Sequence, residues 1–151
     1  MAFVIDAELD IAAPAELVWQ VITDFPRYAE WNPFVTGCES SLKPGDPIDL
    51  QVRVFSDKPQ AQREWIRTHT PGREFSYSMK PVPLGTLHSA RSHTVIPLGP
   101  GRCRYRSHFE LAGWLQPLVR GLLGASLRRG FAGMTEGIKT RAERLWKEQQ
   151  G

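Results

Sequence analysis

The last third of the chain carries one uninterrupted helical pattern. Between residues 113 and 150 no proline follows Pro117, and apolar residues recur with the 3.6-residue period of an α-helix. The apolar stripe consists of Leu123, Leu127, Phe131, Met134, Ile138, Ala142 and Leu145. The pattern predicts an amphipathic helix of about 30 residues, roughly 45 Å long. A helix of that length needs a large apolar partner to cover its stripe.

A second stripe, made of small residues, runs beside the apolar one on the same predicted helix. It consists of Ser126, Gly130, Gly133 and Gly137. Each glycine in a helix costs up to about 1 kcal/mol relative to alanine, so the stripe requires an explanation. Two interpretations account for it: a sheet or strand approaches the helix closely there, or the stripe leaves room for a ligand between helix and sheet.

Upstream of residue 113 the pattern changes to the period of two that is typical of β-strands. Residues 3–11 predict a first strand, and residues 15–23 and 26–30 predict two short helices. Six further strands are predicted at residues 34–42, 48–54, 61–68, 74–79, 88–96 and 103–111. Because short turns join these six strands, they should pair antiparallel. The expected fold class is α+β, with a seven-stranded curved antiparallel sheet wrapped around the C-terminal helix in a single domain over residues 1–151.

Composition and charge exclude several classes of protein. The chain is 41% hydrophobic and 23% charged, which is ordinary for a globular protein. Its net charge of +3 comes from dispersed basic residues, so we expect no nucleic-acid partner. No apolar run approaches the roughly 18 residues of a membrane span, and no signal-peptide pattern is present. We therefore expect a cytoplasmic protein without integral membrane association, and the sequence does not indicate its oligomeric state.

The polar residues show no established catalytic or metal-binding motif. Cys38 and Cys103 lack metal-ligand spacing, and there is no glycine-rich phosphate loop and no nucleophile elbow. We expect no metal and no other cofactor. Histidine can act as a base near neutral pH, so His88, Arg91 and His93 in the sixth predicted strand of the chain are weak catalytic candidates. That strand, residues 88–96, is polar on both faces, so its period does not decide which of them face inward.

Two segments near the N-terminus resemble a known family. Residues 11–19 read Ile-Ala-Ala-Pro-Ala-Glu-Leu-Val-Trp, and residues 24–34 read Asp-Phe-Pro-Arg-Tyr-Ala-Glu-Trp-Asn-Pro-Phe. With the element order of essentially the whole chain, they resemble the START-like, Bet v 1-like superfamily. The sequence is most similar to the polyketide cyclase/dehydrase-like branch, often called SRPBCC. The resemblance implies a helix-grip fold, in which a hydrophobic cavity separates the sheet from the long helix.

A cavity of this kind would be lined from three places. The sheet would contribute Leu50, Val52, Val54, Trp65, Phe75, Tyr77, Tyr105 and Phe109. The short helices and the segment after them would contribute Phe25, Trp31, Asn32 and Phe34, and the long helix would contribute Leu123, Leu127, Phe131 and Met134. The alternative is that these side chains fill a solid core. For Trp31 and Asn32, the alternatives are a packing tryptophan at a helix stop and an amide that orients a ligand.

The sequence is compatible with three functions. The first is a carrier or sensor that binds a hydrophobic small molecule such as a lipid, isoprenoid or polyketide, which requires a cavity for about ten heavy atoms. The second is a cyclase or dehydratase acting on a polyketide, which requires two polar groups that converge on one substrate position. The third is a module that binds a protein or a membrane surface, for which Trp114, Leu115 and Leu118 form the candidate patch. The residues favour the carrier or sensor, because aromatic side chains are abundant and no convergent catalytic set is visible.

Overall fold

The computed structural model describes residues 2–54 and 57–151, and its element order is the predicted one. The elements are β1 (Phe3–Ile11), α1 (Ala15–Thr23), the 3₁₀ helix η1 (Phe25–Glu30), β2 (Val35–Ser40), β3 (Pro47–Val52), β4 (Gln60–Thr70), β5 (Glu74–Ser78), β6 (His88–Gly99), β7 (Arg102–Ala112) and α2 (Gln116–Gln150). The second short helix is a 3₁₀ helix, which accommodates Pro26 in its first turn. The predicted fold class, α+β with a helix-grip arrangement, is confirmed.

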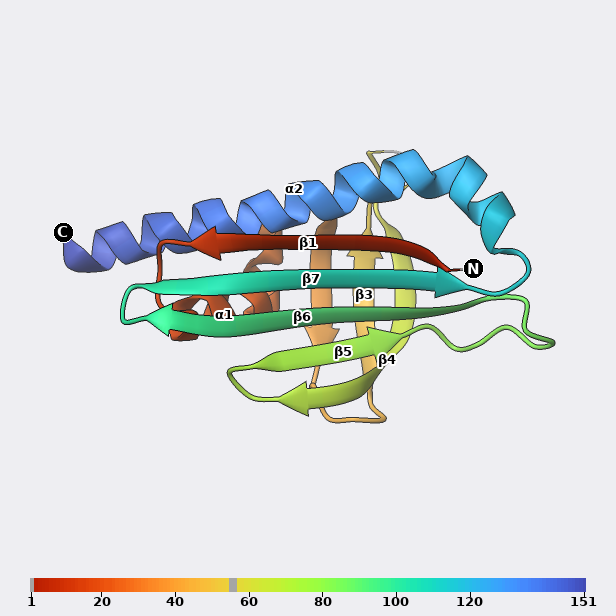
Figure 1. The fold of residues 1–151 in the computed structure, drawn as a ribbon, viewed down its shortest axis with the longest axis horizontal. Coiled ribbons are helices and arrows are strands. Elements are labelled where there is room, and N and C mark those ends of the chain that lie inside the picture. The colour runs from red at the N-terminus through yellow and green to blue at the C-terminus, as the bar shows by residue number, and fades with distance from the viewer. Residues whose placement is uncertain (1, 55–56) are drawn as a thin grey trace.

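All seven strands form one antiparallel sheet in the order β1-β7-β6-β5-β4-β3-β2. Strands β2 to β7 follow one another as a meander, and β1 joins the far side of β7. The sheet curls, so that β3 and β4 lie behind β1 and β7 in Figure 1 while α2 runs along the enclosed side. The helix therefore lies between the two edges of the sheet.

The pairing of β1 with β7 joins the first and the last strand of the chain and is matched in charge. On the outer face, Asp6 lies opposite His108, Glu8 opposite Arg106 and Asp10 opposite Arg104. Asp10 contacts Arg104 at 2.8 Å, and hydrogen bonds from Arg104 and then Arg102 lower the pKa of its carboxyl. Exposed ion pairs of this kind contribute at most about 1 kcal/mol each. They favour the observed register, while burial of apolar side chains on the inner face supplies most of the stability.

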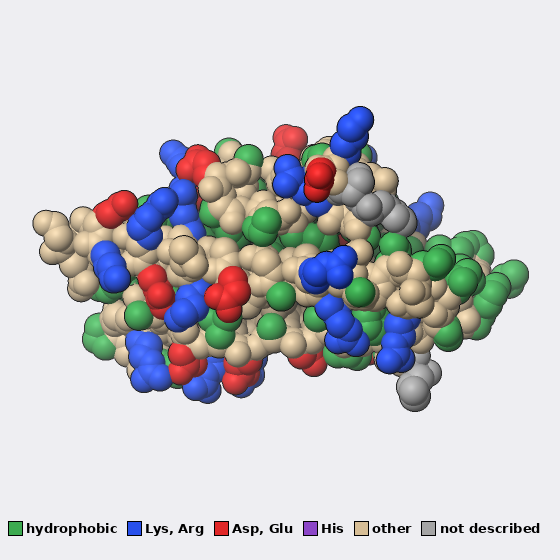
Figure 2. Space-filling view, turned by 90° about the horizontal axis from the view of Figure 1, so that it is seen from above, with side chains coloured by type: hydrophobic (Ala, Val, Ile, Leu, Met, Phe, Trp, Pro, Cys, Tyr) green, Lys and Arg blue, Asp and Glu red, His purple; other side chains and the backbone are tan. Residues whose placement is uncertain are grey.

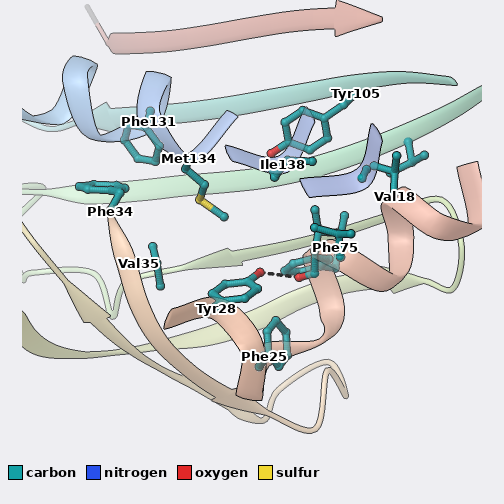
Figure 3. Packing of buried hydrophobic residues seen from close by; sticks show 14 of the residues in the cluster. Val18, Phe25, Tyr28, Phe34, Val35, Phe75, Tyr105, Phe131, Met134 and Ile138 are labelled. Carbon is teal, nitrogen blue, oxygen red and sulfur yellow. Dashed lines mark hydrogen bonds between the residues drawn. The ribbon is translucent and has the colours of Figure 1, made fainter. Parts of the chain in front are cut away.

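The apolar stripe of α2 faces the sheet as predicted. Phe131, Met134, Ile138 and Ala142 are buried, and Figure 3 shows Ile138 beside Tyr105 of β7 and Phe131 near Phe34. Burial of a side chain the size of methionine or isoleucine stabilises the fold by about 1.5–3 kcal/mol. The stripe is thus the main apolar surface that the helix contributes to the core.

The helix begins at Gln116, so Pro117 lies in its first turn, where the sequence predicts it. Gly113 has a φ of +117°, a backbone conformation that favours glycine, and a Cβ there would lie 2.3 Å from the Thr86 carbonyl oxygen. The next two amides, of Trp114 and Leu115, donate to the carbonyls of Gly85 and Thr86. The β5–β6 loop therefore holds residues 113–115, which precede the helix.

The small-residue stripe is explained largely by close approach of the chain. A Cβ on Gly137 would lie 2.8 Å from the Trp31 carbonyl oxygen, and a Cβ on Gly130 would lie 2.2 Å from the Phe34 ring. The partner is the segment from Trp31 to Phe34, which leads into β2, and not a strand within the sheet. The close-approach interpretation is therefore correct, but the neighbour is this segment and not a sheet or strand.

We predict that Gly137→Ala destabilises the protein by about 1–3 kcal/mol, because the new methyl group meets backbone that cannot move aside. Gly121→Ala is the matched control on the same helix, since a Cβ there meets nothing within 4 Å. The control should be neutral or stabilising by up to about 1 kcal/mol. Urea unfolding of the two variants measures both effects, and equal effects would contradict the close-approach explanation.

Candidate functional site

A pocket lies between the concave face of the sheet and α2. It is lined by Phe34, Val35, Leu50, Val52, Val54, Gln62, Glu64, Tyr77, Arg91, Phe109, Leu127 and Phe131. We call this space the inner pocket. Its volume is about 100 Å³, smaller than the roughly 300–1,000 Å³ of sites for drug-sized ligands. Most of its wall is apolar, and its polar groups come from β4, β5 and β6.

Several of the residues predicted to line a cavity border the inner pocket. Phe34, Leu50, Val52, Val54, Tyr77, Phe109, Leu127 and Phe131 were predicted to line a cavity and do line the inner pocket. Arg91, a weak catalytic candidate, lines it too, whereas Val35, Gln62 and Glu64 were missed. Glu64 stands among charged and polar residues in the sequence of β4. No periodic pattern there marks it as internal.

The orientation of β4 corrects one prediction. Glu64 and Ile66 are buried on its inner face, and Trp65 is half-buried on the opposite face. Trp65 therefore does not line the inner pocket, and Arg63 on the same outer face pairs with Asp49 at 2.6 Å. The cationic group that lines the pocket is Arg91.

Glu64 is the unusual acid of this site, because its side chain is only 7% exposed. Burial penalises the charged carboxylate and raises the pKa of Glu64 to about 7. Two weaker influences oppose that rise: the Gln62 amide donates a hydrogen bond to Glu64 Oε2 at 2.6 Å, and Arg91 contributes a positive charge. Glu64 can consequently gain or lose a proton near neutral pH.

Arg91 places a buried positive charge at the other polar wall of the pocket, and it is 3% exposed. Its Nη1 donates to Ser107 Oγ at 2.6 Å and to the carbonyls of Ser92 and His108. The guanidinium also lies 4.6 Å from the centre of the Phe131 ring. Among the described residues, no carboxylate forms an ion pair with Arg91. A buried charge held only by neutral groups makes the pocket attractive to an anion or a carbonyl oxygen.

The structure decides which residues of β6 face inward. Arg91 and His93 are buried, whereas His88 is exposed on the outer side. The Nδ1 atom of His93 lies 2.6 Å from the Tyr105 hydroxyl, and burial followed by the charge of Arg91 holds the pKa of His93 well below its usual range. His93 is therefore a neutral, hydrogen-bonded core residue, and it does not line the inner pocket.

The remaining predicted lining residues pack elsewhere. Phe25, Phe75, Tyr105 and Met134 belong to the buried core, and Figure 3 shows Phe25 and Phe75 grouped around Tyr28 near α1. Tyr28 donates a hydrogen bond from its hydroxyl to the Ile22 carbonyl (Figure 3). Trp31 packs on Tyr28, and Leu123 is half-buried on α2 outside the pocket lining. The end of the sheet that faces α1 is thus filled by side chains.

Asn32 has a structural role in the observed conformation. Its Oδ1 accepts hydrogen bonds from the amides of Phe34 and Val35 at 3.0 and 2.9 Å, so it fixes the turn into β2. Its Nδ2 is the only buried side-chain nitrogen or oxygen in the described part of the chain without a hydrogen-bond partner. Asn32 does not line the inner pocket but determines where the Phe34 side chain lies.

A second hollow adjoins the inner pocket at the surface. This outer groove is lined by Pro33, Phe34, Arg53, Val54, Ser126, Arg129 and Gly130, and its volume is about 310 Å³. Phe34 and Val54 border both spaces. Two members of the small-residue stripe, Ser126 and Gly130, line this open hollow, so room for a ligand beside them stays a prediction.

The described residues contain neither a metal-ligand cluster nor a membrane-spanning helix. Among them, no group of three or more His, Cys, Asp or Glu side chains is placed to hold a metal ion. None of the described helices combines the length and apolar character of a membrane-spanning segment.

Comparison with known proteins gives one family match. The profile of the family described as "Polyketide cyclase / dehydrase and lipid transport" matches residues 2–143. No curated protein matches the sequence significantly.

Solved structures share the fold at low sequence identity. The Zhui aromatase/cyclase from Streptomyces sp. R1128 superimposes with a TM-score of 0.77 at 19% identity, covering 95% of each chain. A START superfamily protein from Mycobacterium smegmatis gives 0.70 at 18% identity, covering 94% of this chain and 98% of its own. A point mutant of norcoclaurine synthase from Thalictrum flavum gives 0.69 at 20% identity, covering 100% and 98%. At these identities the likeness establishes the fold.

We predict that Glu64 makes stability depend on pH. Its pKa is about 7 in the folded protein and ordinarily 4.5, so its favourable contribution is present below pH 4.5 and is lost as pH rises through 7. Glu64→Gln removes the titrating carboxyl group and therefore removes this loss of stability at higher pH. The unfolding free energy of the variant relative to the natural protein should increase by on the order of 2–3 kcal/mol between pH 4.5 and pH 8. Urea unfolding over this range measures the difference, and a pH-independent difference would contradict the assignment.

Proposed function

The chain belongs to the polyketide cyclase/dehydrase and lipid transport family, and from this premise we propose that it is a carrier or sensor of a hydrophobic small molecule. Family membership implies hydrophobic ligand binding. The observation that supports the proposal is the inner pocket, which has apolar walls and lies between the sheet and α2. Apolar walls with a few polar groups are the usual composition of a small-molecule site.

The polar groups suggest the chemistry of the ligand. An apolar body would contact Leu50, Val52 and Leu127, and one oxygen-bearing end would face Arg91 and Glu64. Arg91 offers hydrogen-bond donors and a positive charge, and protonated Glu64 offers one more donor. The best match is an amphiphilic molecule with a carbonyl, phenol or carboxylate at one end.

The size of the site bears on this proposal. The inner pocket alone does not hold about ten heavy atoms, which the carrier function requires. The outer groove adds about 310 Å³ and shares Phe34 and Val54 with the pocket. A ligand of that size would occupy both spaces, with the Phe34 side chain displaced from between them.

An enzymatic function is the second candidate, and the location of Glu64 and Arg91 on one pocket supports it. A carboxylate whose pKa lies near 7 suits proton abstraction next to a carbonyl group. In such a step Glu64 would take the proton and Arg91 would stabilise the enolate oxygen that forms. This assignment replaces the histidine base considered from the sequence, because the inward histidine is held by Tyr105.

We predict that Leu127→Trp reduces ligand uptake by at least about tenfold, because the larger ring fills the inner pocket. Leu145→Trp is the matched control, since Leu145 lies on the same helix and lines a different hollow. Both variants should lose similar stability, about 1–3 kcal/mol. Native mass spectrometry of co-purified ligand and titration with an anilinonaphthalene sulfonate dye measure uptake. Equal uptake by the two variants would contradict the proposed site.

Glu64→Gln distinguishes the carrier from the enzyme. In a carrier the variant should retain the co-purifying molecule within a few-fold, because glutamine keeps a hydrogen-bonding group at the same position. In an enzyme the variant should retain binding and lose turnover by roughly 10²–10⁴-fold. The assay incubates both proteins with the molecule identified by native mass spectrometry and follows its conversion by liquid chromatography.

A further inference from the structure

Exposed apolar side chains gather at one end of the molecule. Leu84 is 93% exposed, Leu122 74%, Trp114 67% and Leu118 57%. Figure 2 shows the resulting group of hydrophobic side chains at the end where α2 begins. We call these four residues the apolar tip. Exposed leucines in this density differ from the singly scattered apolar residues of an ordinary protein surface.

The β5–β6 loop and the start of α2 together form the apolar tip. The indole Nε1 of Trp114 donates to the Leu84 carbonyl at 3.1 Å, which fixes the loop against the helix start. Leu84 has a φ of +64°, a conformation that leucine rarely adopts, and its side chain projects into solvent. Leu118 and Leu122 are four residues apart on α2, so the two lie on one side of the helix, and Trp114 immediately precedes it.

The charged residues that flank the apolar tip in sequence are mostly basic. Between Phe75 and Thr135 the only acidic residue is Glu110, on β7. The residues that flank the tip in sequence include Lys80, Arg120, Arg128 and Arg129. The second half of α2 differs, because it mixes both signs and contains ion pairs such as Lys139–Glu143. An apolar surface bordered by cations complements an anionic lipid surface, in which apolar chains lie beneath phosphate groups.

We propose that the apolar tip docks this protein on the surface of an anionic membrane. The leucines and Trp114 would enter the boundary between headgroups and acyl chains, and Lys80 and the arginines would contact lipid phosphates. A second copy of the chain is a poorer occupant, because two such faces would bring like charges together. The proposal does not depend on any ligand in the inner pocket.

Docking in this orientation would bring the outer groove close to the membrane. Leu122 lies one turn before Ser126 on α2, and Ser126 and Arg129 line the groove. A hydrophobic molecule leaving the bilayer would then meet the groove before it meets water. The tip and the groove are neighbouring parts of one surface.

The test is sedimentation of the full chain with two kinds of lipid vesicle, without added ligand. One kind contains equal parts of phosphatidylcholine and phosphatidylglycerol, and the other contains phosphatidylcholine alone. We expect binding to the anionic vesicles that weakens as salt increases. The Leu118→Ser/Leu122→Ser variant should bind at least about tenfold more weakly. Lys80→Gln/Arg120→Gln should bind more weakly at low salt and show a smaller salt dependence.

Leu98→Ser is the control, because Leu98 is exposed near the end of β6, at the opposite end of the molecule. It should bind like the natural protein, and all variants should keep its thermal unfolding midpoint because the changed side chains are exposed. The proposal is overturned if the natural protein does not bind anionic vesicles or if the leucine variant binds them unchanged. It is also overturned if light scattering shows a dimer that the leucine variant abolishes. Dye uptake by the leucine variant is measured as well, because it tests ligand binding in the inner pocket independently of membrane binding.

Discussion

The contact between the glycines of α2 and the segment from Trp31 to Phe34 is the constraint on which this structure depends. The helix contacts β1 at one edge of the sheet, and through Gly130 and Gly137 it meets the chain that enters β2 at the other edge. One helix therefore holds both edges of a curled sheet. Any side chain at Gly137 would separate them, because it would meet backbone. The short distance between α2 and this segment also limits the volume that remains between the helix and the sheet.

The same contact divides the interior into two parts with different chemistry. Toward α1 the space is filled by aromatic rings, and the neutral His93–Tyr105 pair satisfies the polar groups there. Toward the start of α2 the sheet and the helix diverge enough to leave the inner pocket. Phe34 lies at its boundary with the outer groove because Asn32 fixes the turn that precedes it. A packed half thus supports a half that has room for a ligand.

The inner pocket keeps two ionisable groups, Glu64 and Arg91, where water is scarce. Burial raises the pKa of Glu64, and the positive charge of Arg91 limits that rise. Neither group forms an ion pair with the other in the described structure, so both have capacity for a polar ligand atom. This arrangement is compatible with binding and with proton transfer, and the two differ only in what the ligand does once it is bound. The apolar tip lies outside this chemistry, at the surface beside the groove.

The sequence by itself determined the element order, the apolar stripe of α2, the helix start near Pro117 and the antiparallel meander, because these follow from local periodicity and turn residues. It did not determine the partner of β1, which depends on pairing between distant strands. It also did not determine that Glu64 faces inward and Trp65 outward, since β4 is polar on both faces. Only the tertiary structure decided these features and the small size of the pocket, because the space between a helix and a sheet depends on side chains from every element that packs there.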